Sequence, residues 1–499
     1  MTRPDSPRQS IVQRALGGHA AIGLLASALI YILALTGSLI VIHDRWQRWE
    51  QPLVTETRYL SPDAAQRAMQ AVLASEAGKP RTAHLYIRMP TDDLPRAVVT
   101  TDNGAWYVDG AGRVVGREAH AWTEFLIAMH EYLHLPTTWG LILVGALGVM
   151  LVVLVVTGVL AHPRIIRDAF RLRMRHDPQI ARADWHNRLG VWTVPFVLAV
   201  ALTGAFIGLG SVGFSMLARA YTGGDMERIY APIFGQDPAP DAAKAPLADA
   251  ATALRVLGRR VPFADPTYVT IHDPGTRGQH IQILADHPRR LIYGESYVFD
   301  GAGRWRGPIG LSNGAIGKQV AASTYNLHFG NYGGLAVEIA YMLLGGALCV
   351  VTATGTTLWL QKRRRRGLRG DRLAACWDVI LWGVPLLLLA MLWLRALAGP
   401  DAPLAAGFWS SLAAAIIVAA ARPAVIARAH LRRTVAAAVL TTACLHLIAF
   451  PDAPPGVIAI DAVIIVPFAT TLAIRFGRRR RPAAPGTVRT LEEVGGAAR

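Results

Sequence analysis

Cysteine is scarce in this sequence, and its scarcity excludes several kinds of site. The 499 residues include three cysteines, Cys349, Cys376 and Cys444, and each lies in or beside an apolar run. A disulfide framework or a cysteine-ligated metal cluster is therefore not expected. The sequence has no Cys-x-x-Cys-His motif, which excludes haem attached covalently through cysteine. It has no Gly-x-Gly-x-x-Gly motif after a strand pattern either, so we expect no bound NAD(P)H or flavin.

Long apolar runs are abundant. Hydrophobic residues make up 52% of the chain, and many lie in runs of about twenty, the length that crosses a bilayer. Met1 to Leu16 is polar and basic, and the first apolar run is long enough to span, so we expect no cleavable signal peptide. Eight membrane spans are predicted: Gly18–Ile42, Trp139–Ala161, Leu189–Leu217, Gly334–Leu360, Ala375–Leu397, Ala405–Ala421, Thr434–Phe450 and Val457–Ile474.

Positive charge is concentrated beside these runs. A net charge of +17 could indicate nucleic-acid binding, but the arginines and lysines cluster at span ends, as in Lys362–Arg366 and Arg478–Arg481. This distribution follows the positive-inside rule, so we expect a lipid bilayer and no nucleic acid as the surroundings. The rule predicts a bacterial inner-membrane protein with both termini cytoplasmic. The connections His43–Thr138 and Ala218–Gly333 then lie in the periplasm and are long enough to be folded domains.

The apolar spans repeat a pattern of histidine, threonine and glycine. His19 precedes Thr36-Gly37 by 17 residues, and His186 precedes Thr203-Gly204 by 17 residues. Spans two and four each follow a Leu-His pair, and each contains a Thr-Gly pair near its far end, Thr157-Gly158 or Thr354-Gly355. Glycine lets another helix or a flat macrocycle approach closely, and both interpretations stay open.

The two long connections repeat as well. Each opens with a helical pattern, Ser61–Ala77 or Pro246–Arg259. Each continues with strand-like alternation, as in Ala83–Met89 and Thr267–Ile271. Each then reaches an identical Asp-Gly-Ala-Gly-Arg sequence, at residues 109–113 and 300–304, which predicts a tight turn between two strands. Both copies begin on the same side, so the repeat is parallel and brings equivalent side chains together.

These patterns predict a polytopic α-helical membrane protein with about eight transmembrane helices and two α+β domains between helices one and two and helices three and four. The expected boundaries are 1–43 for helix one, 44–138 for the first external domain, 139–217 for helices two and three with a basic loop, 218–333 for the second external domain, 334–362 for helix four, 373–475 for a C-terminal four-helix region and 476–499 for a basic tail.

Fifteen histidines are present, and those at span ends are candidates for metal ligation. A b-type haem takes two imidazoles from different helices. The repeat offers His19 with His186 near the inner face, and His134 or His130 with His328 near the outer face. His130 and His134 are spaced i, i+4, so both could lie on one side of a helical turn. For each of these histidines, and for His43 and His162, an ordinary place at the membrane interface is the alternative.

Several stretches resemble the PepSY-associated transmembrane family, which includes iron-regulated membrane proteins and ferric-siderophore reductases. The resemblance covers about residues 10 to 365. Its motifs are His-Glu-Tyr-Leu-His-Leu-Pro at 130–136, Thr157-Gly158 through 162–173, Asp-Trp-His-Asn at 184–187 with Leu-Gly-Val at 189–191 and Pro195-Phe196, and Asn-Leu-His-Phe-Gly at 326–330 with Gly333-Gly334.

This resemblance implies PepSY-like external domains and a four-helix core that binds haem b, for which we expect two copies. It implies that the family's histidines correspond to His19, His130, His134, His162, His186 and His328. It also implies electron flow from the cytoplasmic side to a ferric siderophore or another ferric chelate outside. The spans after about Arg372 fall outside the resemblance.

The leading hypothesis is therefore a haem-dependent transmembrane reductase that serves iron acquisition. Its electron donor is expected to be a separate cytoplasmic reductase or membrane quinol. One alternative is a transporter of iron or a siderophore, in which the intramembrane residues Glu338 and Asp461 would matter. Another is a non-enzymatic membrane protein whose PepSY-like domains bind a partner.

Overall fold

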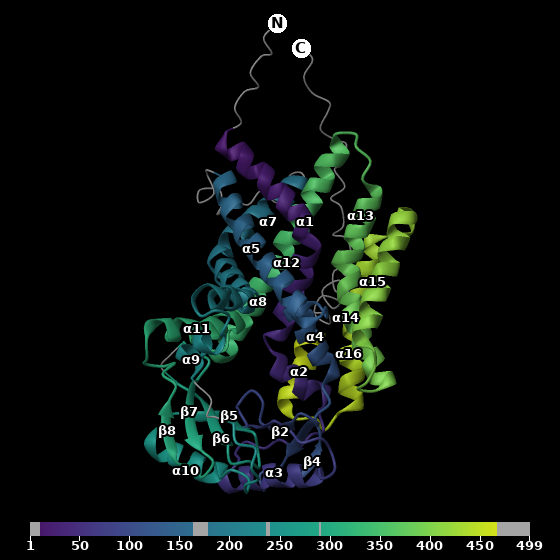
Figure 1. The fold of residues 1–499 in the computed structure, drawn as a ribbon. Coiled ribbons are helices and arrows are strands. Elements are labelled where there is room, and N and C mark those ends of the chain that lie inside the picture. Colours follow the sequence, from purple (N-terminus) through teal and green to yellow (C-terminus); the bar gives the residue numbers. More distant parts are fainter. Residues whose placement is uncertain (1–9, 163–177, 236–239, 289–290, 467–499) are drawn as a thin grey trace, which may run out of the picture. The chain divides into compact units, whose positions relative to one another are not determined.

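The computed structural model describes residues 10–162, 178–235, 240–288 and 291–466 (Figure 1). The chain divides into two compact units, Met1–Val435 and Ala436–Arg499. The first unit contains a helical bundle and an antiparallel sheet. The second contains the end of helix α16 (Arg428–Ala449) and an apolar helix at Pro455–Val466.

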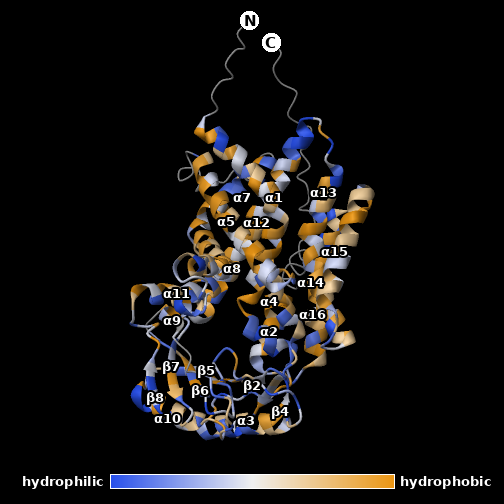
Figure 2. Cartoon of the chain, in the orientation of Figure 1, coloured by the Kyte–Doolittle hydropathy of each residue, from blue (hydrophilic) through white to orange (hydrophobic). Residues whose placement is uncertain are grey.

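Seven helices in the described part of the chain are long and apolar enough to cross a membrane. They are α1 (Ile11–Ile40), α5 (Thr137–Ala161), α8 (Val194–Tyr221), α12 (Gly334–Arg365), the helix Asp371–Ala398, α15 (Leu404–Ala421) and α16. Their residues are predominantly apolar in Figure 2. The eighth predicted span, 457–474, is described only as far as Val466.

The four spanning helices of the repeat pack against one another in one bundle. Helix α1 packs against α5 and α12, and α5 packs against α8; α7 (Pro178–Trp192), which precedes α8, packs against α12. By the sequence repeat, the first copy contains α1 and α5, and the second contains α7, α8 and α12. Glycine brings the copies close, because a Cβ at Gly145 would lie 2.8 Å from Leu209 and one at Gly208 would lie 2.7 Å from the Leu141 carbonyl oxygen.

Short helices connect the bundle to the sheet (Figure 1). In the first copy these are α2 (His43–Glu50) and α4 (Ala121–Tyr132), and in the second α9 (Glu227–Phe234) and α11 (Ile316–Phe329). Helix α4 ends at Leu133 and His134, which have φ values of 55° and 53°. Helix α11 ends at Gly330, with a φ of 78°. The left-handed backbone stops both helices just after a histidine, His130 or His328.

The two long connections form one continuous eight-stranded antiparallel sheet. Its order is β4-β3-β2-β1-β5-β6-β7-β8, and the pairing of β1 with β5 joins the two copies. The strands are β1 (His84–Arg88), β2 (Ala97–Thr101), β3 (Gly104–Val108), β4 (Val114–Arg117), β5 (Asp265–His272), β6 (His280–Asp286), β7 (Glu295–Asp300) and β8 (Trp305–Pro308).

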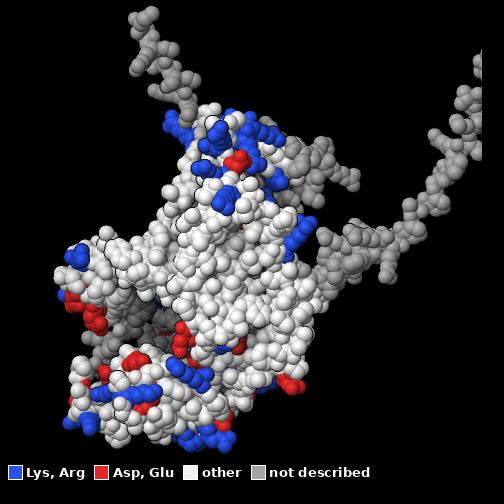
Figure 3. Space-filling model, turned by 90° about the vertical axis from the view of Figure 1, so that its right-hand side faces the viewer, with Lys and Arg blue, Asp and Glu red and all other residues white. Residues whose placement is uncertain are grey.

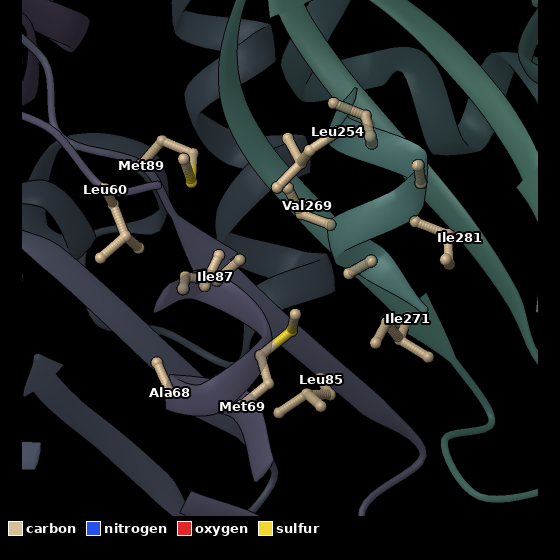
Figure 4. Close-up of a cluster of buried hydrophobic side chains, with 14 of the residues drawn as sticks. Leu60, Ala68, Met69, Leu85, Ile87, Met89, Leu254, Val269, Ile271 and Ile281 are labelled. Atoms are coloured by element: carbon tan, nitrogen blue, oxygen red, sulfur yellow. The ribbon is translucent and has the colours of Figure 1, made fainter. Parts of the chain in front are cut away.

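Two helices cover one face of this sheet, α3 (Pro62–Ser75) and α10 (Ala250–Arg260). Alternate strand residues such as Leu85, Ile87, Val269 and Ile271 are fully buried beneath them and form a shared core (Figure 4). The predicted helices and strands of both connections are therefore confirmed. The copies share one core instead of forming two separate ones.

The repeated Asp-Gly-Ala-Gly-Arg sequences form the β3–β4 and β7–β8 turns, as predicted. The amide of Asp109 donates to the Arg113 carbonyl at 2.9 Å, and the equivalent Asp300 amide donates to Arg304 at 3.0 Å. The second glycine of each turn has a positive φ, 80° at Gly112 and 73° at Gly303. A side chain there would also clash with the covering helix, because a Cβ at Gly303 would lie 2.8 Å from the Asp249 carbonyl oxygen.

Charge divides the first unit along its length. Lys and Arg gather at the end of the bundle away from the sheet, and a broad uncharged surface separates them from the charges around the sheet (Figure 3). Helix α12 ends in this basic region with Lys362, Arg363, Arg364 and Arg365. We call this the basic end and the opposite one the sheet end.

Candidate functional site

Four histidines lie against the four glycines of the Thr-Gly pairs. A Cβ at Gly37 would lie 2.7 Å from Cε1 of His130, and one at Gly158 would lie 3.2 Å from Cε1 of His19. In the second copy the corresponding distances are 2.8 Å between Gly204 and His328 and 2.9 Å between Gly355 and His186. Each imidazole therefore occupies the space that a larger side chain would take.

The same four rings are oriented through Nδ1. His130 bonds the Leu33 carbonyl oxygen at 2.9 Å, His19 bonds that of Leu154 at 3.0 Å, and His186 bonds that of Val351 at 2.9 Å. Each carbonyl lies three residues before the threonine of a Thr-Gly pair. His328 differs, because its Nδ1 lies 3.0 Å from Oγ1 of Thr203, the threonine of the Thr-Gly pair itself.

These bonds fix the tautomer of the imidazoles. A carbonyl oxygen only accepts, so Nδ1 of His19, His130 and His186 carries the proton and donates it. Nε2 is then left with its lone pair, which is the state in which histidine binds a metal. A second bond that orients the ring is typical of metal-ligating histidines.

The rings meet in pairs, one from each copy. The centroids of His19 and His186 are 6.3 Å apart with planes at 77°. Those of His130 and His328 are 6.1 Å apart with planes at 35°. Two imidazoles on opposite sides of one metal ion have centroids about 6 Å apart, since each nitrogen is about 2 Å from the metal and about 1 Å from its ring centre. Both separations therefore fit bis-imidazole ligation of one iron, as in a b-type haem.

The two pairs lie at different levels of the bundle. His19 belongs to the basic end, and Gly37, which touches His130, follows it by 18 residues on the same helix. This spacing corresponds to roughly 27 Å along α1. We call His19 and His186 the basic-end pair, and His130 and His328 the sheet-end pair.

Burial affects the charge of the sheet-end pair, whose helices α4 and α11 lie outside the spanning segments. Removal from water lowers the pKa of His130. Burial and the neighbouring His130 lower the pKa of His328 to about 4. Both rings are therefore neutral at neutral pH and able to coordinate a metal.

His134 does not join this pair. Its Nε2 lies 3.0 Å from the Phe125 carbonyl oxygen, and its ring stacks on Phe125 with centroids 4.9 Å apart. The expectation that His130 and His134 share one helical face does not hold. The reason is the left-handed backbone at Leu133 and His134, which ends α4 between them. His130 is the ring that faces His328.

Two further candidates are His162 and His43. His162 follows the last residue of α5, next to residues outside the described ranges. His43 bonds the Ile40 carbonyl oxygen through Nδ1 at 3.1 Å, and its Nε2 lies 3.3 Å from Asp44. Within the described ranges, no group of three His, Cys, Asp or Glu residues is arranged to hold a metal ion.

Glu338, an intramembrane acid in the transport hypothesis, is paired. Its carboxylate lies 3.1 Å from Arg45 Nε, and the same guanidinium contacts Asp93 at 2.6 Å. Arg45 thereby connects span α12 to α2 and to the β1–β2 loop. The sequence offered no signal for this role of Arg45, because its two partners are far from it in the chain.

Comparison with known proteins agrees with this architecture. The chain is 27% identical over 252 residues to a protein of Pseudomonas aeruginosa named uncharacterized protein PA4219. This match covers 48% of the chain and 64% of the relative, so it spans less than two thirds of the relative's length. The family model for the PepSY-associated TM region matches residues 17–362, which include all four spans and both external segments of the repeat. The chain therefore belongs to the PepSY-associated transmembrane family.

Proposed function

We propose that this protein is a haem-binding inner-membrane reductase that passes electrons from the cytoplasmic side to a ferric siderophore or another ferric chelate in the periplasm. The observation that carries the proposal is the pair of facing imidazoles at each end of the four-helix core. A haem held at each pair supplies reversible one-electron chemistry. The chain's own residues orient the four imidazoles that would hold the haems.

The ligands need little rearrangement to bind. Three of their Nδ1 atoms already donate to backbone carbonyls, and that of His328 lies 3.0 Å from Thr203 Oγ1. The glycines of the four Thr-Gly pairs leave room for the rings. Such preorganisation lowers the cost of binding a rigid cofactor.

The two pairs lie near opposite edges of the membrane core. The hydrocarbon core is about 30 Å thick, and a bare electron does not cross it unaided. The two pairs lie roughly 27 Å apart along α1, so a haem at each pair would stand near one edge of the core, within reach of a redox partner on that side. The basic end of the bundle is assigned to the cytoplasm by the positive-inside rule, which places the sheet in the periplasm.

The electron donor and the electron acceptor are expected on opposite sides of the membrane. A cytoplasmic reductase or membrane quinol would reduce the haem of the basic-end pair. The ferric chelate would accept electrons near the sheet-end pair. Reduction releases iron, because the hard oxygen ligands of a siderophore hold Fe(III) more tightly than the less charged Fe(II).

Haem content tests the proposal directly. Protein purified from haem-replete cells is expected to contain two haems per chain by the pyridine haemochrome assay, with low-spin spectra. His186→Ala and His328→Ala should each remove one haem, whereas the matched control His134→Ala should retain both, because His134 faces Phe125. A colourless wild-type preparation, or full haem content in both pair variants, would refute the reductase.

A further inference from the structure

The C-terminal helices outside the matched family region pack against the first copy of the repeat. They are α13 (Asp371–Asp378), α14 (Val384–Ala398) and α15, with a π-helical turn at Val379–Gly383. Helices α14 and α15 both contact α4, the short helix that carries His130. The family match ends at residue 362, so it does not cover these helices.

Arg395 of α14 holds the beginning of α4. Its Nη2 donates to the Ala119 carbonyl oxygen at 2.5 Å, and its Nε lies 2.9 Å from Glu50 Oε1. The Glu50 carboxylate in turn accepts from the amides of Trp122 at 3.0 Å and Thr123 at 2.9 Å. Residue His120 at the N-cap makes no capping bond, so Glu50 satisfies the first amides of α4 in its place.

This Glu50 contact is buried. The side chain is 1% exposed, and burial raises the pKa of Glu50, while Arg395 and the two amides act in the opposite direction. A buried carboxylate is costly without such partners. Arg395 therefore makes the capping of α4 dependent on α14.

Two tryptophans hold the rest of α4. Trp122 near its start donates Nε1–H to the Leu388 carbonyl oxygen of α14 at 2.9 Å. Trp409 of α15 donates Nε1–H to the carbonyl oxygen of Leu133, the C-cap residue, at 3.0 Å. Between them, Phe408 of α15 packs on Phe125 with centroids 5.9 Å apart. The C-terminal helices thus grip α4 at both ends and along one side.

A further hydrogen bond attaches the C-terminal helices to α1. Tyr31 donates its hydroxyl to the Leu381 carbonyl oxygen at 2.9 Å. That oxygen lies four residues before Pro385, which has no amide hydrogen to give it, within a π-helical turn. The contact serves α1 and does not touch α4, which makes it a useful comparison.

The second copy fastens its histidine helix from within. Tyr341 of α12 donates to the Leu327 carbonyl oxygen at 2.6 Å, and its ring covers Gly330 at the end of α11. Asn326 of the same helix donates to the Ile292 carbonyl oxygen at 2.7 Å. The two halves of the sheet-end pair are therefore positioned by different means.

We propose that helices α14 and α15 form a clamp whose Arg395 and Trp409 position α4, and with it His130, opposite His328. The role of His130 as a ligand rests on the function proposed above, whereas the clamping of α4 does not. Arg395 and Trp409 are positioning residues, because they act on the pair only through α4.

Hydrogen exchange tests the clamp without reference to any cofactor. Trp409→Phe keeps an aromatic ring but removes the bond to Leu133, and Arg395→Gln removes the ion pair with Glu50. Each should raise amide exchange in residues 121–134 about fivefold, the effect of losing one buried hydrogen bond, and leave residues 316–329 unchanged. Tyr31→Phe removes the hydrogen bond between α1 and the C-terminal helices and should leave amide exchange in α4 unchanged. Tyr341→Phe should instead raise amide exchange in residues 316–329. Wild-type exchange of 121–134 in both clamp variants would overturn the proposal.

A second readout tests the consequence for the pair. In a His19→Ala, His186→Ala background only the sheet-end pair can hold haem, so its low-spin resonance and midpoint potential are observed alone. Trp409→Phe and Arg395→Gln should shift both quantities, Arg395→Lys should restore part of the shift, and Tyr31→Phe should leave them unchanged. Altered exchange in protein that binds no haem would support the clamp and refute the reductase. Bound haem together with unaltered exchange and spectra in the clamp variants would support the reductase and refute the clamp.

Discussion

Each glycine of a Thr-Gly pair lies against the ring of one histidine. The sequence left open whether they serve helix packing or the approach of a macrocycle, and the structure adds a third contact, with the imidazoles themselves. In three of the four pairs the carbonyl three residues before the threonine accepts from Nδ1 of the same ring, and in the fourth Nδ1 of His328 lies 3.0 Å from the threonine hydroxyl, Thr203 Oγ1. A short sequence pattern thus provides both the space and the anchor for each histidine.

Replacing one of these glycines should displace one ring. In Gly204→Ala the new methyl group would lie 2.8 Å from His328 Cε1, closer than unstrained atoms approach, so the imidazole must move. We expect the sheet-end haem to be depleted severalfold relative to the basic-end haem, measured as haem per protein. Gly210→Ala on the same helix meets no atom within 4 Å and is the matched control. Equal haem content in the two variants would contradict this role of Gly204.

At the scale of elements, apolar length predicted the spans well. Span two was expected at Trp139–Ala161 and is found as Thr137–Ala161. The choice between His130 and His134 could not be made in this way, because it depends on two left-handed residues, neither of them glycine, at Leu133 and His134. The contacts of Arg45 with Glu338 and Asp93 were likewise inaccessible, since tertiary packing alone brings these residues together.

The joining of the external segments into one sheet was also beyond the sequence. Alternation predicted β1 and β5 individually, but strand order depends on pairing between residues nearly two hundred positions apart, such as Tyr86 with Thr270. Register is set by burial of one face, here by Ile87 and Val269 in the common core. The Gly turns identify the hairpins within each copy and carry no information about the strand that joins the copies.

Cysteine pairs can test this junction. Tyr86 and Thr270 are direct neighbours across β1 and β5, so Tyr86→Cys with Thr270→Cys should form a disulfide under mild oxidation, detected by mass spectrometry of linked peptides. Tyr86→Cys with Ile271→Cys is the control, because Ile271 points to the opposite, buried face. Equal cross-linking of both pairs, or of neither, would show that the register differs from β1–β5 pairing.

At the scale of the whole molecule, the parallel repeat has a functional consequence. Each copy orients its own two histidines, yet each facing pair combines one ring from each copy. Neither copy alone supplies both rings of a pair. The contacts of α5 with α8 and of α1 with α12 therefore determine how the two rings of each pair are placed, as well as stability.

The two pairs should be separable in the direction of electron flow. In sealed right-side-out vesicles, His186→Ala retains only the sheet-end pair, so its haem should be oxidised by a membrane-impermeant ferric chelate outside but no longer reduced by the internal donor. His328→Ala retains only the basic-end pair, so its haem should be reduced from inside but reoxidised slowly by the same chelate. Stopped-flow absorbance of the haem α band measures both half-reactions. The two pairs lie roughly 27 Å apart along α1, near opposite faces of the membrane, so each is placed to meet only the partner on its own side. Rapid transfer from the internal donor to the external chelate in either variant would contradict a serial path through both.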